Sequence, residues 1–284
     1  MKEMQQWTTV IKPTGKLWSI DFVELWAYRD LYSLFVKRDI ITQYKQTILG
    51  PIWFFVQPLL TTIMYMVVFG GIAGISTDGL PQALFYLSGI LCWQYFADCL
   101  NSTSSTFITY QNIFGKVYFP RLIVPLATVT SNLVRLGIQT TLLILVYCYF
   151  LLFTEFPLSA NWALLLFPIL VFLLAGLALG FGMIISSLTT KYRDLTILFT
   201  FIVQLWMYAT PIIYPLSVIT NPDLRLAMSL NPVTGIVETF RYSVLGVGEF
   251  SWGLLGYSAA FMAVLLVAGM VVFNKVQRSF MDTV

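Results

Sequence analysis

The sequence predicts an all-α integral membrane protein with six transmembrane helices, and its composition, its apolar runs and its distribution of charge all lead to that prediction. Apolar residues make up 58% of the 284 positions and charged residues only 10%, against roughly 25% charged residues in ordinary globular domains. A soluble fold of this length needs more charge to cover its surface. The net charge of +3 is too small and too scattered to predict a nucleic-acid partner.

Six apolar runs are long enough to cross roughly 30 Å of hydrocarbon, which takes about 20 residues in a helix. They lie at about 52–74, 82–100, 122–153, 161–188, 195–214 and 252–273. The third and fourth runs exceed the minimum, so they must tilt, kink or project beyond the bilayer. We therefore expect one transmembrane domain over 52–274, between an N-terminal segment, 1–51, and a tail, 275–284.

The segment before the first run, residues 21–38, predicts an amphipathic helix along the membrane interface. Its apolar face is formed by Leu25, Tyr28, Tyr32, Phe35 and Val36, and its charged face by Arg29, Asp30 and Lys37. The alternative is a solvated lead-in to the first span. Pro51 suits the first turn of that span, where its missing N–H costs nothing.

The stretch before the last run, residues 215–250, is too broken to span and too apolar for a free loop. Pro215, Pro222 and Pro232 interrupt it. This pattern predicts two short helices separated at Asn231-Pro232, lying at the membrane or dipping into it as a re-entrant segment.

The positions of the basic residues predict the orientation. With six spans both termini share one side, and that side holds thirteen of the sixteen Lys and Arg residues. The opposite side holds only Arg225 and Arg241, while Arg135 falls within the third span. We therefore expect both termini in the cytoplasm.

Motifs for catalysis are missing from the sequence. It has no histidine, no G-x-x-x-x-G-K-[ST] phosphate loop and no pair of ligands at metal spacing on a helix. We therefore expect no enzyme activity, no metal and no cofactor. Any active transport needs a separate ATPase, which would bind the ATP and Mg²⁺.

Two charged residues lie at membrane depth, where ionisable groups are costly and often functional. Asp98 is near the cytoplasmic end of the second span, and Arg135 is in the third. A functional interpretation is a pair, or a water-facing group in a pathway. The structural alternatives are snorkelling of Asp98 to the helix end, and a structural pair or a carbonyl contact for Arg135.

Aromatic residues are abundant, and those near span ends, such as Trp53, Trp162 and Trp252, predict an interfacial belt. Others could face a conduit for carbohydrate, because aromatic faces stack on sugar rings while the polar tips bond hydroxyl groups. The candidates are Tyr65, Tyr86, Trp93, Tyr95, Trp206 and Tyr208. Belt positions or helix packing remain the alternative for each of them.

Glycines at 176, 180 and 182 in the fourth run permit close packing of helices in the small-xxx-small manner. Because glycine is common in membrane helices, the pattern alone does not identify the neighbouring helix.

The connector 101–120, NSTSSTFITYQNIFGKVYFP, lies on the expected cytoplasmic side. It starts with a Ser/Thr cluster that can cap a helix, continues as an amphipathic pattern and ends in a basic-aromatic sequence. Twenty residues are long for an ordinary connector, which is the alternative. We expect a short cytoplasmic helix that transmits force from a partner to both adjoining spans.

Four stretches resemble one family in the right order. VKRDIITQYKQTILGPIWFFVQPLLTTIMYMVVFG (36–70) resembles the start of the permease subunits of bacterial polysaccharide ABC exporters, which move O-antigen, capsule or teichoic-acid chains. Residues 112–126 resemble the coupling helix of that family. Residues 191–215 resemble its short cytoplasmic turn, fifth span and Pro-bounded exit, and residues 230–246 resemble its extracytoplasmic re-entrant segment.

The resemblance implies a homodimer in the bacterial cytoplasmic membrane that docks two copies of a separate ATPase and exports a lipid-linked glycan. It implies that the 215–250 segment is an external gate. By position, it assigns coupling to Phe114, Gly115, Lys116, Tyr118, Phe119 and Arg121, and places Tyr44, Lys45, Gly50 and Pro51 in the motif leading into the first span.

Three other functions stay open on the sequence. One is an ABC exporter of a drug, haem or lipid. Another is a membrane glycosyl- or phosphotransferase, which would need clustered acidic or histidine side chains at a membrane face. The third is a passive channel.

Overall fold

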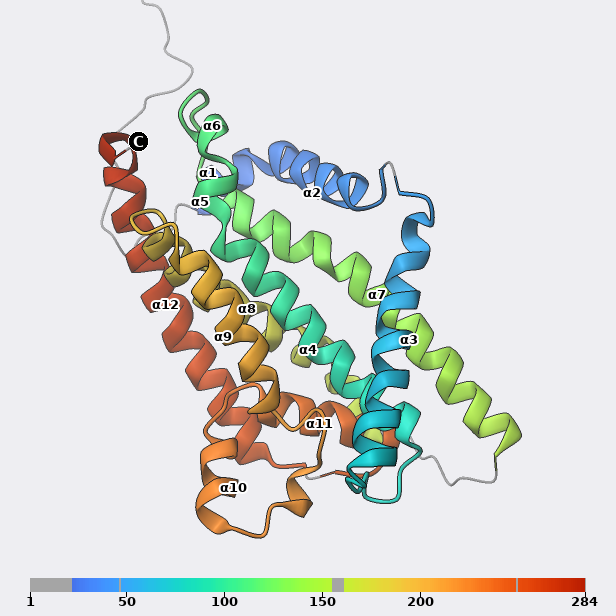
Figure 1. Ribbon diagram of the computed structural model, residues 1–284. Helices are drawn as coiled ribbons and strands as arrows, with labels where there is room; N and C mark the ends of the chain where they lie inside the picture. Colours follow the sequence, from blue (N-terminus) through green and yellow to red (C-terminus); the bar gives the residue numbers. More distant parts are fainter. Residues whose placement is uncertain (1–21, 46, 155–160, 249, 284) are drawn as a thin grey trace, which may run out of the picture.

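The regular structure in the described residues is helical throughout. The computed structural model describes residues 22–45, 47–154, 161–248 and 250–283. Long helices form a bundle, and α2 lies across one end of it (Figure 1). Of the segment expected in the cytoplasm, residues 1–21 lie outside the described residues, and so does the first position of the predicted interface helix.

Five helical stretches are long and apolar enough to cross a membrane. The first, Gly50–Ile72, joins a 3-10 turn (η1, Gly50–Ile52), α3 (Trp53–Tyr65) and a π-helical segment (η2, Met66–Ile72). The others are α4 (Gln82–Ser104), α7 (Ile123–Phe153), η3 (Trp162–Leu166) with α8 (Phe167–Thr189), and α12 (Trp252–Thr283). Because α12 runs on to Thr283, the residues expected as a separate tail continue the last helix.

The fifth apolar run forms a shorter helix than predicted. We expected a span over 195–214, but α9 (Leu195–Tyr208) ends six residues earlier. Pro211 explains the difference, because proline lacks an N–H and disfavours helical geometry in the residue before it. The residues beyond α9 leave the helix yet stay inside the protein, since Ile212 and Ile213 are buried.

The predicted helix over 21–38 is divided and continues further. It forms α1 (Phe22–Ala27) and α2 (Arg29–Tyr44), which meet at Tyr28. Phe35 is buried and packs in a cluster with neighbours of the predicted apolar face, while Phe22 and Trp26 of α1 are exposed. Helix α2 packs against α7.

Helix α8 is the centre of the bundle, between α4 and α12. A Cβ atom placed on Gly180 would come within 2.9 Å of Leu265 of α12, and one on Gly182 within 2.5 Å of Thr103 of α4. Real Cβ atoms do not approach so closely, so glycine is what allows both neighbours to pack against α8. The close packing predicted from these glycines is confirmed.

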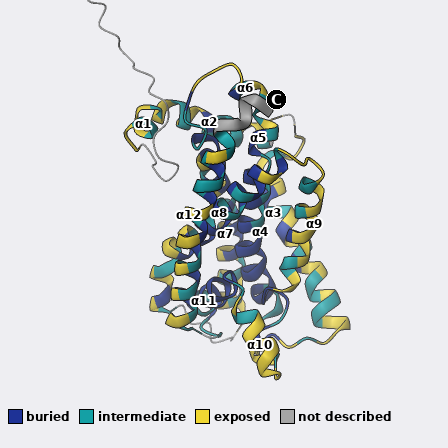
Figure 2. Cartoon of the chain, turned by 90° about the vertical axis from the view of Figure 1, so that its left-hand side faces the viewer, coloured by how far each residue is buried: buried dark blue, intermediate teal, exposed yellow. Residues whose placement is uncertain are grey.

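Two helices occupy the Pro-interrupted stretch, α10 (Pro222–Ser229) and α11 (Thr234–Leu245), after a 3-10 turn (η4, Leu216–Val218). The predicted break at Asn231-Pro232 is confirmed, and Asn231 holds it in place. The Asn231 amide donates to the carbonyl oxygen of Ala209 at 3.0 Å, and its oxygen accepts from the N–H of Val233 at 3.1 Å. Helix α11 is buried, whereas α10 is exposed (Figure 2).

The connector differs from the predicted capped helix. Helix α4 extends through the Ser/Thr cluster to Ser104, and two four-residue helices follow, α5 (Thr106–Thr109) and α6 (Gln111–Phe114). The hydroxyl of Ser104 donates to the Asn101 carbonyl at 2.7 Å, and that of Thr106 to the Thr103 carbonyl at 2.7 Å. Because the preceding turn satisfies these hydroxyls, they extend the helix and do not cap a new one.

Candidate functional site

The connector presents a short exposed tip held between two buried rings. Phe114 and Phe119 are each 4% exposed, whereas Val117 is 58% and Tyr118 54% exposed. Lys116, between these rings, is exposed as well. The predicted coupling residues therefore divide into anchors that point inward and a tip, residues 115–118, that is open to a partner.

An aromatic cluster under the tip joins three elements. Phe35 of α2 lies 5.7 Å from Phe119 and 6.1 Å from Tyr110 of the connector, measured between ring centroids. Phe107 stacks on Phe273 of α12 at 4.6 Å. These ring contacts therefore fix the connector to α2 and to α12.

Polar contacts strengthen this cluster. Arg38 of α2 donates to the Tyr110 hydroxyl at 2.5 Å and pairs with Asp39 at 2.6 Å. Arg121 donates to the carbonyl oxygen of Gln277 in α12 at 2.7 Å. Burial raises the pKa of Tyr110 above its ordinary value, so the hydroxyl that accepts from Arg38 is uncharged at neutral pH.

The sequence analysis missed Arg38 and Asp39, although it had predicted this helix. Two consecutive charged residues cannot both lie on the apolar face of a helix. The pattern therefore predicts that they face solvent. The contact with Tyr110 depends on a ring 72 positions away in the sequence, and only the tertiary structure reveals it.

The motif leading into the first span lies elsewhere. Tyr44 ends α2, Lys45 is exposed, Gly50 has a φ of +53° and Pro51 follows it in the first turn. Glycine suits that backbone conformation, which side chains disfavour. Figure 1 shows this turn at the α3 end of α2, away from α5 and α6. The structure does not bring it together with the tip.

The two intramembrane charges pair with each other. Arg135 of α7 contacts the Asp98 carboxylate of α4 at 2.5 Å, and its guanidinium lies 4.7 Å from the centre of the Phe54 ring of α3. The pair therefore sits where three helices meet. Across the described parts of the chain, no three His, Cys, Asp or Glu side chains gather in a way that could hold a metal ion.

Helix α4 carries an open polar face that the sequence analysis did not identify. From Leu84 to Ser104 nearly every residue is buried. The residues that are not buried are Gln94, Ala97, Asp98, Asn101 and Ser102. All but the alanine are polar, and their spacing places them on one side of a helix. We call Gln94, Asp98, Asn101 and Ser102 the α4 polar face.

The aromatic candidates for a conduit mostly pack against one another inside the chain. Tyr86, Trp93 and Tyr95 are buried, and Trp206 lies edge-on to Trp93 with ring centroids 6.3 Å apart. Tyr65 donates to the sulfur of Met207 in α9 at 3.3 Å and lies 6.0 Å from Tyr86. Tyr208, by contrast, is 54% exposed. Whether a substrate passes these rings stays a prediction.

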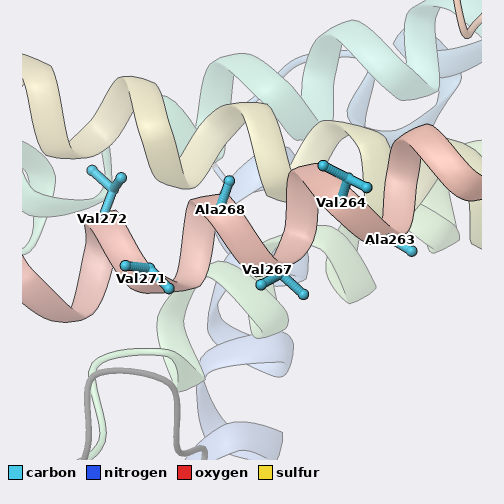
Figure 3. A pocket seen from close by; sticks show the side chains of 6 residues that line it. All are labelled: Ala263, Val264, Val267, Ala268, Val271 and Val272. Carbon is cyan, nitrogen blue, oxygen red and sulfur yellow. The ribbon is translucent and has the colours of Figure 1, made fainter.

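Two outer helices carry shallow grooves of different composition. A shallow groove on α12 is lined by Ala263, Val264, Val267, Ala268, Val271 and Val272 (Figure 3). It is purely aliphatic, as contact with lipid chains requires. The groove on α9 is lined by Thr196, Ile197, Thr200, Phe201 and Gln204. Its hydroxyl and amide groups recur every four residues, along one side of the helix.

A buried ion pair organises the other end of the bundle, and the sequence analysis did not identify it. Arg241 of α11 is 1% exposed and contacts the carboxylate of Glu238 at 2.8 Å. It also donates to the carbonyl oxygen of Pro211 at 2.9 Å, just after α9 ends. Its guanidinium stacks on the Phe85 ring of α4 at 3.8 Å. In the sequence, the i, i+3 spacing of Glu238 and Arg241 was the pattern from which this pair could have been predicted.

Five helical stretches of membrane-spanning length among the described residues define a multi-pass membrane protein. Residues 30–245 match the ABC-2 type transporter family, and the chain belongs to that family.

Named relatives are similar over most of their length. An O-antigen export system permease protein RfbA from Myxococcus xanthus is 26% identical over 219 residues, which cover 77% of this chain and 81% of the relative. A protein of the same name from Klebsiella pneumoniae is 26% identical over 89% of this chain and 94% of its own. Polysialic acid transport protein KpsM from Escherichia coli is 21% identical, over 87% and 93% respectively.

Proposed function

We propose that this chain is the membrane-spanning subunit of an ABC exporter that carries a lipid-linked polysaccharide across the bacterial cytoplasmic membrane. Membership of the ABC-2 family and the names of the relatives support export of a glycan. The observation that carries the proposal is the α4 polar face, an open polar surface on a helix of spanning length.

A polar face at membrane depth needs a polar environment. Amide, carboxylate and hydroxyl groups in contact with lipid chains would lose their hydrogen bonds to water, which is costly. The same groups both donate and accept hydrogen bonds, as the hydroxyl groups of a sugar chain do. We therefore place the α4 polar face on a hydrated path that two copies of the chain enclose between them.

Helix α9 serves as the sixth crossing in this proposal. The turn before it lies at the same end of the bundle as α5 and α6, and the residues after it lie beside α11 at the other end (Figure 1). Six crossings put both termini on one side. The thirteen basic residues on that side make it the cytoplasmic side.

The peripheral helices have distinct roles in this arrangement. Helices α1 and α2 lie along the cytoplasmic interface, where the exposed rings of Phe22 and Trp26 enter the headgroup region. At the other face, α10 and the buried α11 form the external gate, a re-entrant segment closed by the contacts of Asn231 and Arg241.

The partner ATPase supplies the free energy and binds the ATP and Mg²⁺. Two ATPase copies dock on the exposed tips, and movement of a tip acts on α2 and α12 through the aromatic cluster and on α4 through the chain that joins it to the connector. The nucleotide shifts the permease between states only through its different affinity for each of them. The chain itself provides the route.

A test of docking changes the tip and leaves its anchors in place. Lys116→Glu and Tyr118→Ala should each abolish most glycan export and reduce the ATPase activity of the complex, with the chain still present in the membrane. Tyr118→Phe is the matched control, because it keeps the ring and loses only the hydroxyl contact with Glu24 at 3.2 Å. Normal export by both tip variants at normal abundance would refute the docking proposal.

A test of the substrate class uses the reconstituted complex. Vesicles containing the permease and its ATPase should translocate a labelled lipid-linked glycan only with hydrolysable ATP. Transport of a drug, haem or a simple lipid without glycan transport would assign the chain to another export reaction. Conduction without nucleotide would indicate a channel.

A further inference from the structure

Two intramembrane arginines differ in how completely the protein satisfies them. Both terminal nitrogens of Arg241 have acceptors, in Glu238 and in the carbonyl groups of Pro211 and Ile212, and the residue is 1% exposed. The Arg135 side chain is 23% exposed, and among the described residues its acceptor is Asp98 alone. In both residues the Nε atom is buried without a hydrogen-bond partner. The two arginines therefore differ in their terminal nitrogens and in their exposure, since both terminal nitrogens of Arg241 bond inside the protein, whereas Arg135 is partly exposed and contacts Asp98 through one terminal nitrogen.

The surroundings of Arg135 are those of a site open on one side. The Phe54 ring covers one face of the guanidinium at 4.7 Å, in the first turns of α3. Asp98 belongs to the α4 polar face and is itself 27% exposed. It lies six residues before the end of α4 at Ser104, which corresponds to about 9 Å along the helix axis. The pair therefore lies close below the end of the bundle that carries the tip.

The chemistry of the open side identifies the class of ligand. A guanidinium presents paired N–H donors that match two oxygens of a phosphate group, which also carries the compensating negative charge. An arginine without an anionic partner would be costly at this depth in the membrane. When no ligand is bound, Asp98 neutralises the charge of Arg135. The Asp98 carboxylate is partly exposed, and one of its two oxygens contacts Arg135. Another anion can therefore take its place.

We propose that Arg135 binds a phosphate group of the lipid-linked substrate, with Asp98 as its exchangeable counter-ion. This inference rests on the proposed function, since it names the part of the substrate that the chain recognises first. The phosphate would lie at the junction of α3, α4 and α7, with the glycan directed along the α4 polar face.

The experiment measures binding by the full chain in nanodiscs of phosphatidylcholine, without the ATPase. The probe is a polyisoprenyl phosphate, compared with the uncharged polyisoprenol, with phosphatidic acid and with inorganic phosphate. Wild type should bind the polyisoprenyl phosphate in clear preference to the other three. Arg135→Gln should weaken binding roughly 10- to 100-fold, the loss expected for hydrogen bonds to a charged group. The exposed Arg29→Gln is the matched control and should bind as wild type does.

Substitution of Asp98 provides a second test of the inference. Asp98→Asn removes the competing carboxylate and should bind the phosphate at least as tightly as wild type. If the pair is only structural, Asp98→Asn and Arg135→Gln should both impair the protein, and the double variant should restore it. Wild-type binding by the double variant would therefore overturn the inference. Should Arg135→Gln fail to fold, Arg135→Lys keeps the charge without the paired donors and should show an intermediate loss.

Further outcomes separate this inference from the proposed function. If polyisoprenol bound as tightly as polyisoprenyl phosphate, the chain would recognise the hydrocarbon and not the phosphate. If phosphatidic acid bound as tightly, the site would be a general phospholipid site. Either result overturns the inference while leaving glycan export intact. Conversely, the proposed function would be overturned if deletion of the gene left the surface glycan unchanged. The preference for polyisoprenyl phosphate could still be measured in nanodiscs.

Discussion

Removal of Arg241 should destabilise the protein more than removal of Arg241 and Glu238 together. The change Arg241→Met keeps an unbranched apolar stem and removes the guanidinium with its charge. It takes the opposite charge at 2.8 Å away from the Glu238 carboxylate, which is 1% exposed. Removing the opposite charge from a buried carboxylate is costly, because the protein interior solvates an ion poorly.

The structure sets the size of the effect. Breaking a buried pair by removing one partner costs roughly 3–5 kcal/mol. In the double variant Glu238→Gln with Arg241→Met, the charge is gone and the remaining loss is chiefly the hydrogen bonds to the carbonyl groups of Pro211 and Ile212. That loss amounts to roughly 1–3 kcal/mol. The second substitution should therefore recover part of the stability lost by the first.

Thermal unfolding of the purified chain in detergent measures this order. At roughly 2–4 °C per kcal/mol for a chain of this size, Arg241→Met should lower the unfolding temperature by roughly 6–20 °C, and the double variant by less. Arg29→Met, at an exposed position of α2, is the control and should shift the unfolding temperature by little. Additive losses in the double variant would refute the reasoning, because they would mean that the two charges do not depend on each other.

Three further predictions concern packing, protonation and the path. Gly182→Val should cost roughly 1–3 kcal/mol by overpacking, whereas Gly256→Ala, with open space around it, should be neutral or slightly stabilising; urea titrations compare them. Tyr110→Phe should cost about 1 kcal/mol at neutral pH. Because burial raises the pKa of this phenol above 10.0, wild-type stability should fall as pH rises through that raised value, and the variant should lose this dependence. Asn101→Leu and Gln94→Leu should reduce glycan transport in vesicles without lowering the unfolding temperature; unchanged transport would remove the α4 polar face from the path.

Much of the fold was accessible from the sequence because the membrane imposes strong constraints on it. Long apolar runs have few structural alternatives to helices in a bilayer, and the first four runs form helices close to their predicted limits. The last run forms α12, which begins where predicted and continues past the predicted end to Thr283. Local chemistry explains the errors. Pro211 ends α9 early, and the hydroxyl groups after residue 100 bond backward to carbonyls and so lengthen α4.

The site was less accessible, because its contacts join residues that are distant in the sequence. The coupling residues were placed in the correct connector, but their division into buried anchors and an exposed tip depends on rings from α2 and α12. Aromatic content drew attention to Trp93 and Tyr95, which are buried. The polar spacing on α4 was present in the sequence, yet its meaning depends on which helices cover the other faces.

The continuous run of α4 into the connector has a mechanical consequence. Its last turn contacts α8 closely at Gly182 and hydrogen-bonds to it at Thr189, which donates to the Ser104 carbonyl at 3.1 Å. Under the proposed docking at residues 115–118, movement of the tip would reach the packed α4–α8–α12 layer through the two short helices α5 and α6 and through this contact. The non-helical stretch after Tyr208, where α9 ends, would then be the place where the bundle bends. The closely packed helices would move as one unit, and the end of α9 would change shape.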